Sequence, residues 1–158
     1  ELFEGSETPT VIFGLPAEYT RSLGNSKMGS GFLMGVSMGV QMISVFKKKD
    51  LGLEVQALFE GFAKEGAGSP ARSGALIRFG IPLLVAETIY VAPTWTTGIN
   101  NSEKFLGAQI GKRSWLFSVG ALKAGIDFRV GYQRPIGSRA SPSGSDGVTA
   151  GLAINLGW

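Results

Sequence analysis

The segment from Gly147 to Trp158 alternates without interruption between apolar residues and small or polar ones. Side chains of a β-strand point in turn to opposite faces of the sheet, so this period of two predicts a strand with one apolar face. The apolar face comprises Val148, Ala150, Leu152, Ile154, Leu156 and Trp158. This feature constrains the fold most, because it requires a sheet that separates two different environments.

The same alternation divides the rest of the chain into seven further segments, which predicts an all-β fold of eight antiparallel strands. The predicted strands are residues 8–19, 31–46, 51–62, 73–85, 88–97, 104–111, 120–133 and 147–158. At 158 residues the chain has the length of one domain, predicted as 8–158 with an N-terminal extension at 1–7.

The predicted connections alternate in length, which is a second and independent signal. Longer connections at 20–30, 63–72 and 134–146, and one of intermediate length at 98–103, alternate with tight turns at 47–50, 86–87 and 112–114. This alternation is typical of an up-and-down barrel with loops at one rim and turns at the other. Both termini then lie at the rim that carries the turns.

Two kinds of irregularity are expected within the strands. Trp115, Phe117 and Val119 are out of phase with the strand from Leu122 onward, which predicts either a β-bulge or a shifted strand start near Gly120. Prolines remove hydrogen-bond donors from a ladder and predict local interruptions. They occur at Pro16, Pro82 and Pro93.

The composition of the polar face indicates which side of the sheet points outward. Charged residues make up only 17% of the chain, and the polar face is mostly Gly, Ser, Ala, Thr, Gln and Asn. A narrow barrel interior suits such residues, together with a nearly balanced ionic cluster. The predicted cluster comprises Glu18, Glu54, Glu60, Arg78, Lys123, Asp127 and Arg129. We therefore predict a transmembrane barrel with its apolar face outward, although a soluble lipocalin-like barrel with the opposite orientation has the same period.

With this periodicity, loop pattern and terminal strand, the chain resembles the small eight-stranded outer-membrane barrels, a group that includes the OmpA transmembrane domain and OmpX. The resemblance implies a bacterial outer-membrane location with both termini in the periplasm. It also implies that barrel-insertion machinery reads the terminal strand. The residues expected to carry that signal are Leu152, Ile154, Leu156 and Trp158.

Aromatic residues near the predicted strand ends are expected to form the interfacial girdles of such a barrel. They are Tyr19, Tyr90, Trp95, Trp115 and Tyr132. Glycines are frequent on the proposed interior face, where they favour tight curvature over an unfilled lumen.

Chemical function is constrained mainly by missing residue types. The chain contains no His and no Cys, and its basic residues are scattered. We therefore expect no catalytic group, cofactor site or metal site, and no binding of nucleic acid. The expected function is a non-enzymatic structural, anchoring or interaction role in the bilayer, alone or with other envelope proteins. A narrow outer-membrane pore and a soluble ligand-binding barrel remain alternatives.

Overall fold

A computed structural model of the protein describes residues 10–23, 31–42, 51–62, 72–86, 88–99, 104–136 and 146–158. Within these residues the chain is all-β, with strands and no helix. The strands are β1 (Thr10–Leu23), β2 (Gly31–Met42), β3 (Leu51–Phe62), β4 (Arg72–Gly80), β5 (Leu83–Leu84), β6 (Ile89–Gly98), β7 (Lys104–Val119), β8 (Leu122–Pro135) and β9 (Asp146–Gly157).

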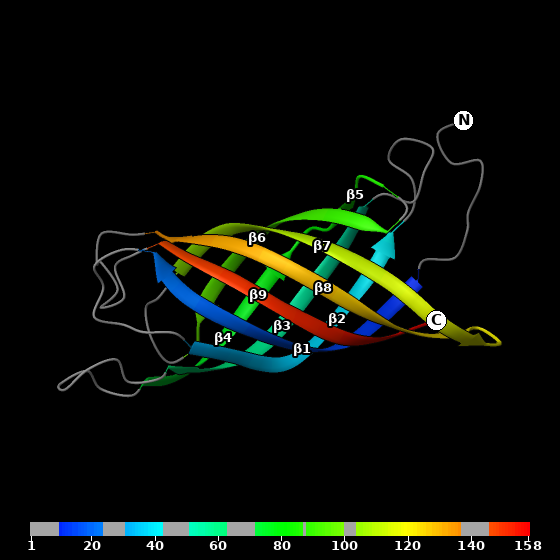
Figure 1. Cartoon of the computed structure of the whole chain (residues 1–158), viewed down its shortest axis with the longest axis horizontal. Helices are drawn as coiled ribbons and strands as arrows, with labels where there is room; N and C mark the ends of the chain where they lie inside the picture. The colour runs from blue at the N-terminus through cyan, green and yellow to red at the C-terminus, as the bar shows by residue number, and fades with distance from the viewer. Residues whose placement is uncertain are drawn as a thin grey trace.

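The strands form one closed antiparallel barrel (Figure 1). Strands that follow each other in the sequence pair around the wall, except that β4 and β5 each pair with β3 and β6 instead of with each other. β1 also pairs with β9 through the ladder from Ile12–Gly157 to Leu23–Asp146. Since β4 and β5 together occupy one place in the wall, the barrel has the eight strands and the up-and-down order that the periodicity predicts.

The two ends of the barrel differ. The start of β1, the end of β9 and the β7–β8 connection at Gly120 lie at one end, which we call the turn end (Figure 1). At this end the backbone groups of Val11 and Trp158 bond each other at 2.9 and 3.1 Å. The opposite end, where β1 leads to β2 and β8 leads to β9, is the loop end.

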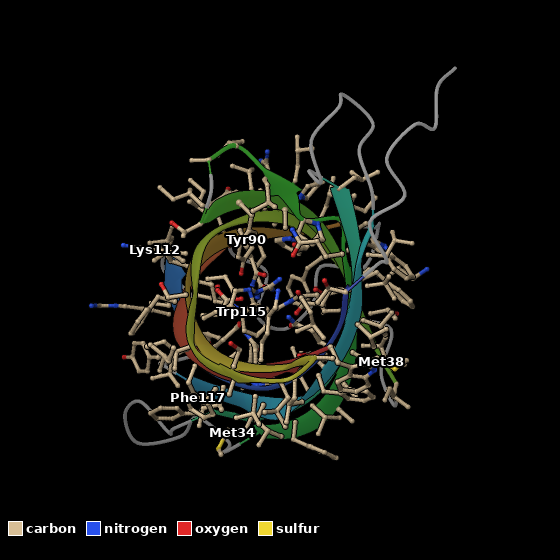
Figure 2. All side chains as sticks on the ribbon, turned by 90° about the vertical axis from the view of Figure 1, so that its right-hand side faces the viewer. Met34, Met38, Tyr90, Lys112, Trp115 and Phe117 are labelled. Atoms are coloured by element: carbon tan, nitrogen blue, oxygen red, sulfur yellow. The ribbon has the colours of Figure 1, made fainter. Side chains whose placement is uncertain are left out.

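The predicted division into two faces is confirmed. Large apolar side chains stand on the outside, as Met34 and Met38 show in Figure 2, and Met34 is 60% exposed. Residues of the opposite phase are buried inside, among them Ser37 at 6% and Asn155 at 1% exposure. The polar face of the sheet is therefore the interior of the barrel.

The predicted fourth strand, 73–85, is interrupted. Ile81 and Pro82 separate β4 from β5, and across the gap stands Pro93 of β6. The carbonyl of Pro93 accepts from the Ile81 N–H at 3.1 Å, and the carbonyl of Pro82 accepts from the Gly52 N–H at 2.8 Å. Because neither proline can donate, the ladder cannot continue through this point.

The third proline causes a milder defect. Pro16 of β1 stays within its strand and pairs with Ala153 of β9. The β1–β2 ladder, however, passes directly from Gly14–Ser37 to Ala17–Met34 without an intervening partner. The predicted interruption at Pro16 is thus a gap on one side of the strand.

The prediction for the sixth strand and its turn is wrong. Residues 112–114, predicted as a tight turn, lie within β7, which continues to Val119. The turn falls instead at 120–121, where Gly120 has a φ of 59°. Glycine adopts this left-handed conformation without the steric cost that a Cβ brings, which explains why the chain reverses there.

A β-bulge reconciles the phases of β7 and β8, as predicted, but it lies earlier than expected. The ladder shifts between Trp115 and Phe117, so Leu116 has no partner on β8. Beyond the bulge Phe117 pairs with Ala124, and Val119 pairs with Leu122. The extra residue turns Phe117 and Val119 toward the outer face, where Leu122 also lies.

The remaining boundaries agree closely with the prediction. The first strand, predicted as 8–19, begins its described part at Thr10 and continues to Leu23 because β9 pairs with it along that whole length. The predicted strand 31–46 is described as far as Met42, and residues 43–50 lie outside the described part of the structure. The strands predicted at 51–62, 88–97 and 147–158 correspond to β3, β6 and β9.

Candidate functional site

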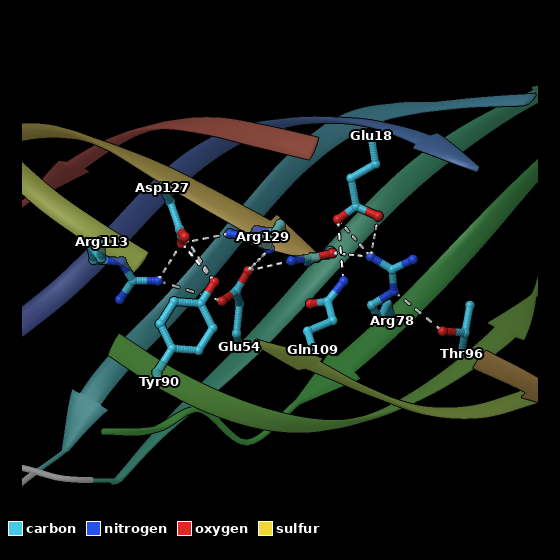
Figure 3. A network of polar contacts seen from close by, with 10 residues as sticks. Glu18, Glu54, Arg78, Tyr90, Thr96, Gln109, Arg113, Asp127 and Arg129 are labelled. Atoms are coloured by element: carbon cyan, nitrogen blue, oxygen red, sulfur yellow. Dashed lines mark hydrogen bonds and ion pairs between the residues drawn. The ribbon is translucent and has the colours of Figure 1, made fainter. Parts of the chain in front are cut away.

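The interior of the barrel is arranged in layers. Leu33, Leu58 and Leu76 form a buried apolar layer toward the loop end. Gln56 and Glu54 precede Leu58 on β3 and therefore lie closer to the turn end. The polar residues thus occupy the lumen between the apolar layer and the turn end. Two ionic layers occupy that space, and we call them together the ionic network (Figure 3).

The first ionic layer is centred on Glu18 and Arg78, which are 1% and 2% exposed. Nη1 of Arg78 donates to both carboxylate oxygens of Glu18 at 2.9 Å and to Oε1 of Gln56 at 3.1 Å. Nε of Arg78 donates to the Thr96 hydroxyl at 3.4 Å, and Gln109 donates to Glu18 at 3.3 Å. The layer therefore joins strands β1, β3, β4, β6 and β7 across the lumen.

The second ionic layer is centred on Asp127, which is fully buried at 0% exposure. Its carboxylate accepts from the Tyr90 hydroxyl at 2.9 Å, from Arg129 at 2.9 Å and from Arg113 at 3.1 Å. Arg129 also donates to Glu54 at 3.1 Å, and Arg113 lies 3.8 Å from the other oxygen of Glu54.

One glutamine connects the two layers. The amide nitrogen of Gln56 donates to Glu54 while its amide oxygen accepts from Arg78. The first layer contains one carboxylate and one guanidinium, and the second contains two of each. Each layer is electrically neutral, which is the condition under which charges tolerate removal from water.

The structure brings together five of the seven charges predicted for the interior. Glu18, Glu54, Arg78, Asp127 and Arg129 belong to the ionic network. The side chain of Glu60 lies outside the described part of the structure.

The prediction that Lys123 belongs to the interior ionic cluster is wrong, since its side chain is exposed. It pairs with Ser118 in the hairpin and with Gly157 at the end of β9. The strand phase of Lys123 does match the interior face, but the barrel wall ends at this level. A side chain that lies inward there meets solvent instead of the ionic network.

Arg113 belongs to the network although the sequence analysis placed it in a turn. Besides its carboxylate partners it donates to Gln41 at 3.4 Å, and its guanidinium lies 5.3 Å from the centre of the Tyr90 ring. The sequence does contain a signal for the interior position of Arg113. The alternation that places Gly107, Gln109 and Gly111 on the interior face continues without a break to Arg113. The cluster of three polar residues at 112–114 resembled a turn and obscured that phase.

Two of the predicted interfacial aromatics point into the barrel instead. Tyr90 is 2% exposed, and its ring fills the space that a Cβ on Gly111 would occupy. Trp115 lies at the turn end within the outline of the barrel (Figure 2). A Cβ on Gly157 would come within 2.7 Å of the Trp115 ring, and a Cβ on Gly125 within 3.0 Å. These glycines make room for aromatic rings, as expected for a filled lumen.

The other predicted aromatics stand on the outer surface. Tyr19, Trp95 and Tyr132 are 42%, 38% and 43% exposed. Tyr19 contacts Phe32 edge to face, and Trp95 stacks on Phe79. The residues predicted as an insertion signal also lie on the outer face, with exposures between 44% and 56%. They are Leu152, Ile154, Leu156 and Trp158.

A small cavity lined by both polar and apolar side chains adjoins the second ionic layer. It has a volume of about 10 Å³, and its lining includes Ser37, Gln41, Glu54, Arg113 and Asn155. This volume corresponds to roughly one water molecule, so the cavity is too small for an organic ligand. Among the described residues, no three acidic, His or Cys side chains are grouped so that they could hold a metal ion.

Comparison with known proteins adds no relative: no family model matches the chain, and no curated protein matches it. In the described residues there is also no helix long and apolar enough to cross a membrane. Function must therefore be inferred from the two faces of the barrel and from the ionic network.

Proposed function

We propose that this protein is an integral β-barrel of a bacterial outer membrane, with a non-enzymatic structural, anchoring or interaction role. Its outer face contacts lipid, and the ionic network closes its lumen. The start of β1 and the end of β9 lie on the periplasmic side, since both lie at the turn end.

The observation that carries the proposal is the inverted distribution of polarity. The outer wall presents apolar side chains in every strand, such as Leu15 (59% exposed), Leu53 (53%) and Ile154 (56%). In water, so much exposed apolar surface would promote association. In a bilayer it is the favourable surface, and the charges are then shielded from lipid by the wall.

The ionic network supports a closed barrel over the narrow-pore alternative. Side chains from opposite walls meet in the middle of the lumen, as Glu18 and Arg78 do at 2.9 Å. An eight-stranded barrel has room for little more than its own side chains. Permeation would require the network to separate, which leaves buried charges unpaired at high cost.

The soluble ligand-binding alternative requires an apolar lumen able to enclose a ligand. Charged and hydrogen-bonded side chains, including Asp127 and Arg129, occupy the described interior instead. The absence of His and Cys from the sequence supports a non-enzymatic role, because these residues supply most catalytic bases and nucleophiles.

The decisive experiment is to fractionate source cells and to reconstitute the purified chain into lipid vesicles. We expect the chain in the outer-membrane fraction, extracted only by detergent, and without current steps in planar bilayers. Recovery of the chain as a soluble monomer would refute the membrane location. Stable conductance steps would instead favour the pore.

A further inference from the structure

The β7–β8 hairpin extends past the wall of the barrel. The last β7 residue paired with β6 is Lys112, followed only by a backbone bond from the Arg113 N–H to the Thr88 carbonyl at 2.8 Å. From Ser114 to Val119, the ladders of the described residues pair β7 with β8 alone. Figure 1 shows the tip of this hairpin beyond the C-terminus. Among the described residues, one edge of β7 therefore has no partner strand over 114–119.

The tip of the hairpin is strongly apolar. Leu116, Phe117, Val119 and Leu122 are 62%, 64%, 74% and 45% exposed. Phe117 stands on the outside of the barrel outline in Figure 2. An exposed apolar strand with an open edge is a template for the addition of another strand.

If the protein lies in a membrane as proposed above, lipid does not cover the apolar surface of the hairpin tip. Lys112 is exposed on the outside of the barrel (Figure 2), and it is the last residue of β7 that pairs with β6. A lysine in the hydrocarbon region would cost about 2–4 kcal/mol, so Lys112 marks the level of the headgroups. The hairpin then lies in the aqueous space beyond them, where its apolar face needs a protein partner.

Charge defines the chemistry of that partner. From Lys112 to Ile126 the chain contains the cations Lys112, Arg113 and Lys123 and no acidic residue. Since Arg113 is held inside by Asp127 and Glu54, the exposed cations are Lys112 and Lys123, one on each strand of the hairpin. A partner segment whose charge is complementary to these lysines therefore carries acidic residues.

We propose that the hairpin is a docking strand for another envelope protein. That protein adds an extended segment to the open edge of β7 at residues 114–119. Its alternate apolar side chains pack against Leu116, Phe117 and Val119, and its acidic residues lie on the opposite face of the added strand, the face to which the strand phase assigns Lys123.

A second copy of this chain cannot form a regular backbone ladder with residues 114–119 of β7 through its own residues 114–119. Two copies in one membrane are related by rotation about the membrane normal, so their β7 strands run parallel and at equal height. Donors then face donors, whereas a regular parallel ladder requires each donor to face an acceptor of the other strand. This geometry favours a different protein as the occupant.

The test uses the full chain in lipid nanodiscs and a synthetic peptide that alternates glutamate and valine. Amide hydrogen exchange is measured with and without the peptide. We expect exchange at residues 114–119 to slow about tenfold in the wild type and not in Phe117→Asp, which removes an apolar contact and adds repulsion. The matched control is Ile99→Ser, which changes another exposed apolar residue at the loop end and should leave the protection intact.

A peptide that alternates lysine and valine tests the role of charge. Equal protection by both peptides would overturn the acidic partner, and protection at other strands, or none, would overturn the docking strand. Failure of the membrane proposal is distinguishable from both, because the chain would then not enter nanodiscs at all.

Discussion

Arg78 on β4 and Glu18 on β1 meet across the lumen, with one guanidinium nitrogen 2.9 Å from both carboxylate oxygens. These residues are sixty positions apart in the chain, and both are almost completely buried. The pair can form only once the barrel has closed, so it links the polar lumen directly to the stability of the fold.

Removal of Arg78 should therefore destabilise the barrel. We expect Arg78→Ala to lower the free energy of unfolding by about 3–5 kcal/mol, because it leaves Glu18 charged and buried without its cation. Lys123→Ala is the matched control and should change it by less than about 0.5 kcal/mol, since Lys123 is exposed. Urea-induced unfolding in lipid vesicles measures both values, and equal stabilities of the two variants would contradict the role of the ionic network.

Gly111 is expected to be intolerant of any side chain. A Cβ there would overlap ring carbons and the hydroxyl oxygen of Tyr90, whose hydroxyl donates to Asp127. We expect Gly111→Ala to cost about 1–3 kcal/mol through overpacking. Gly61→Ala is the control, because nothing lies within 4 Å of its added Cβ. Thermal unfolding of the two variants compares them, and an equally small effect at both sites would show that the lumen is looser than described.

A charge on the outer wall distinguishes lipid from water as its surroundings. Val36 is 56% exposed on β2, in the middle of a strand. In a bilayer, Val36→Lys should destabilise the protein by about 2–4 kcal/mol. In water the same change should be close to neutral. Folding yield into vesicles and unfolding in urea report the difference, with Ile99→Lys at the loop end as the control expected to fold normally.

The hairpin turn depends on the left-handed conformation of Gly120. We expect Gly120→Ala to destabilise the hairpin by about 1–2 kcal/mol, because its φ of 59° brings a Cβ close to the backbone. Gly120→Asn should cost less, since asparagine tolerates this conformation. Hydrogen exchange at residues 116–124 measures the local effect. Faster exchange throughout the barrel would mean that the turn supports more than the hairpin.

Much of the barrel could be read from the period of the side chains. The strict alternation in 147–158 predicts both the strand and its outward residues, and Leu152 and Ile154 are exposed as expected. The alternation also predicts interior positions for Glu18, Arg78 and Asp127. Such local patterns succeed because the side chains of one strand reveal the environment of each face without reference to any other strand.

The prediction from side-chain alternation was wrong at 112–114, where two local signals indicated different structures. The charged and polar residues 112–114 indicated a turn, although the interior phase from Gly107 continues through Arg113. Only pairing with β8 on one side and with the start of β6 on the other shows that the strand continues. The prediction for Tyr90 was wrong for a different reason. Its position near a strand end indicated the interfacial girdle, whereas its phase in the strand indicated the interior of the barrel, where it lies.

By itself, therefore, the sequence determined the all-β fold, the strand faces and most of the residues that enter the lumen. The tertiary structure decided which charges meet. Arg129 bridges Asp127 and Glu54, and Arg78 reaches Glu18, because barrel closure brings distant strands opposite each other. It also decided that Lys123 meets solvent and that, among the described residues, β7 pairs only with β8 over 114–119. Both depend on where the neighbouring strands end, and no residue in the hairpin itself encodes that.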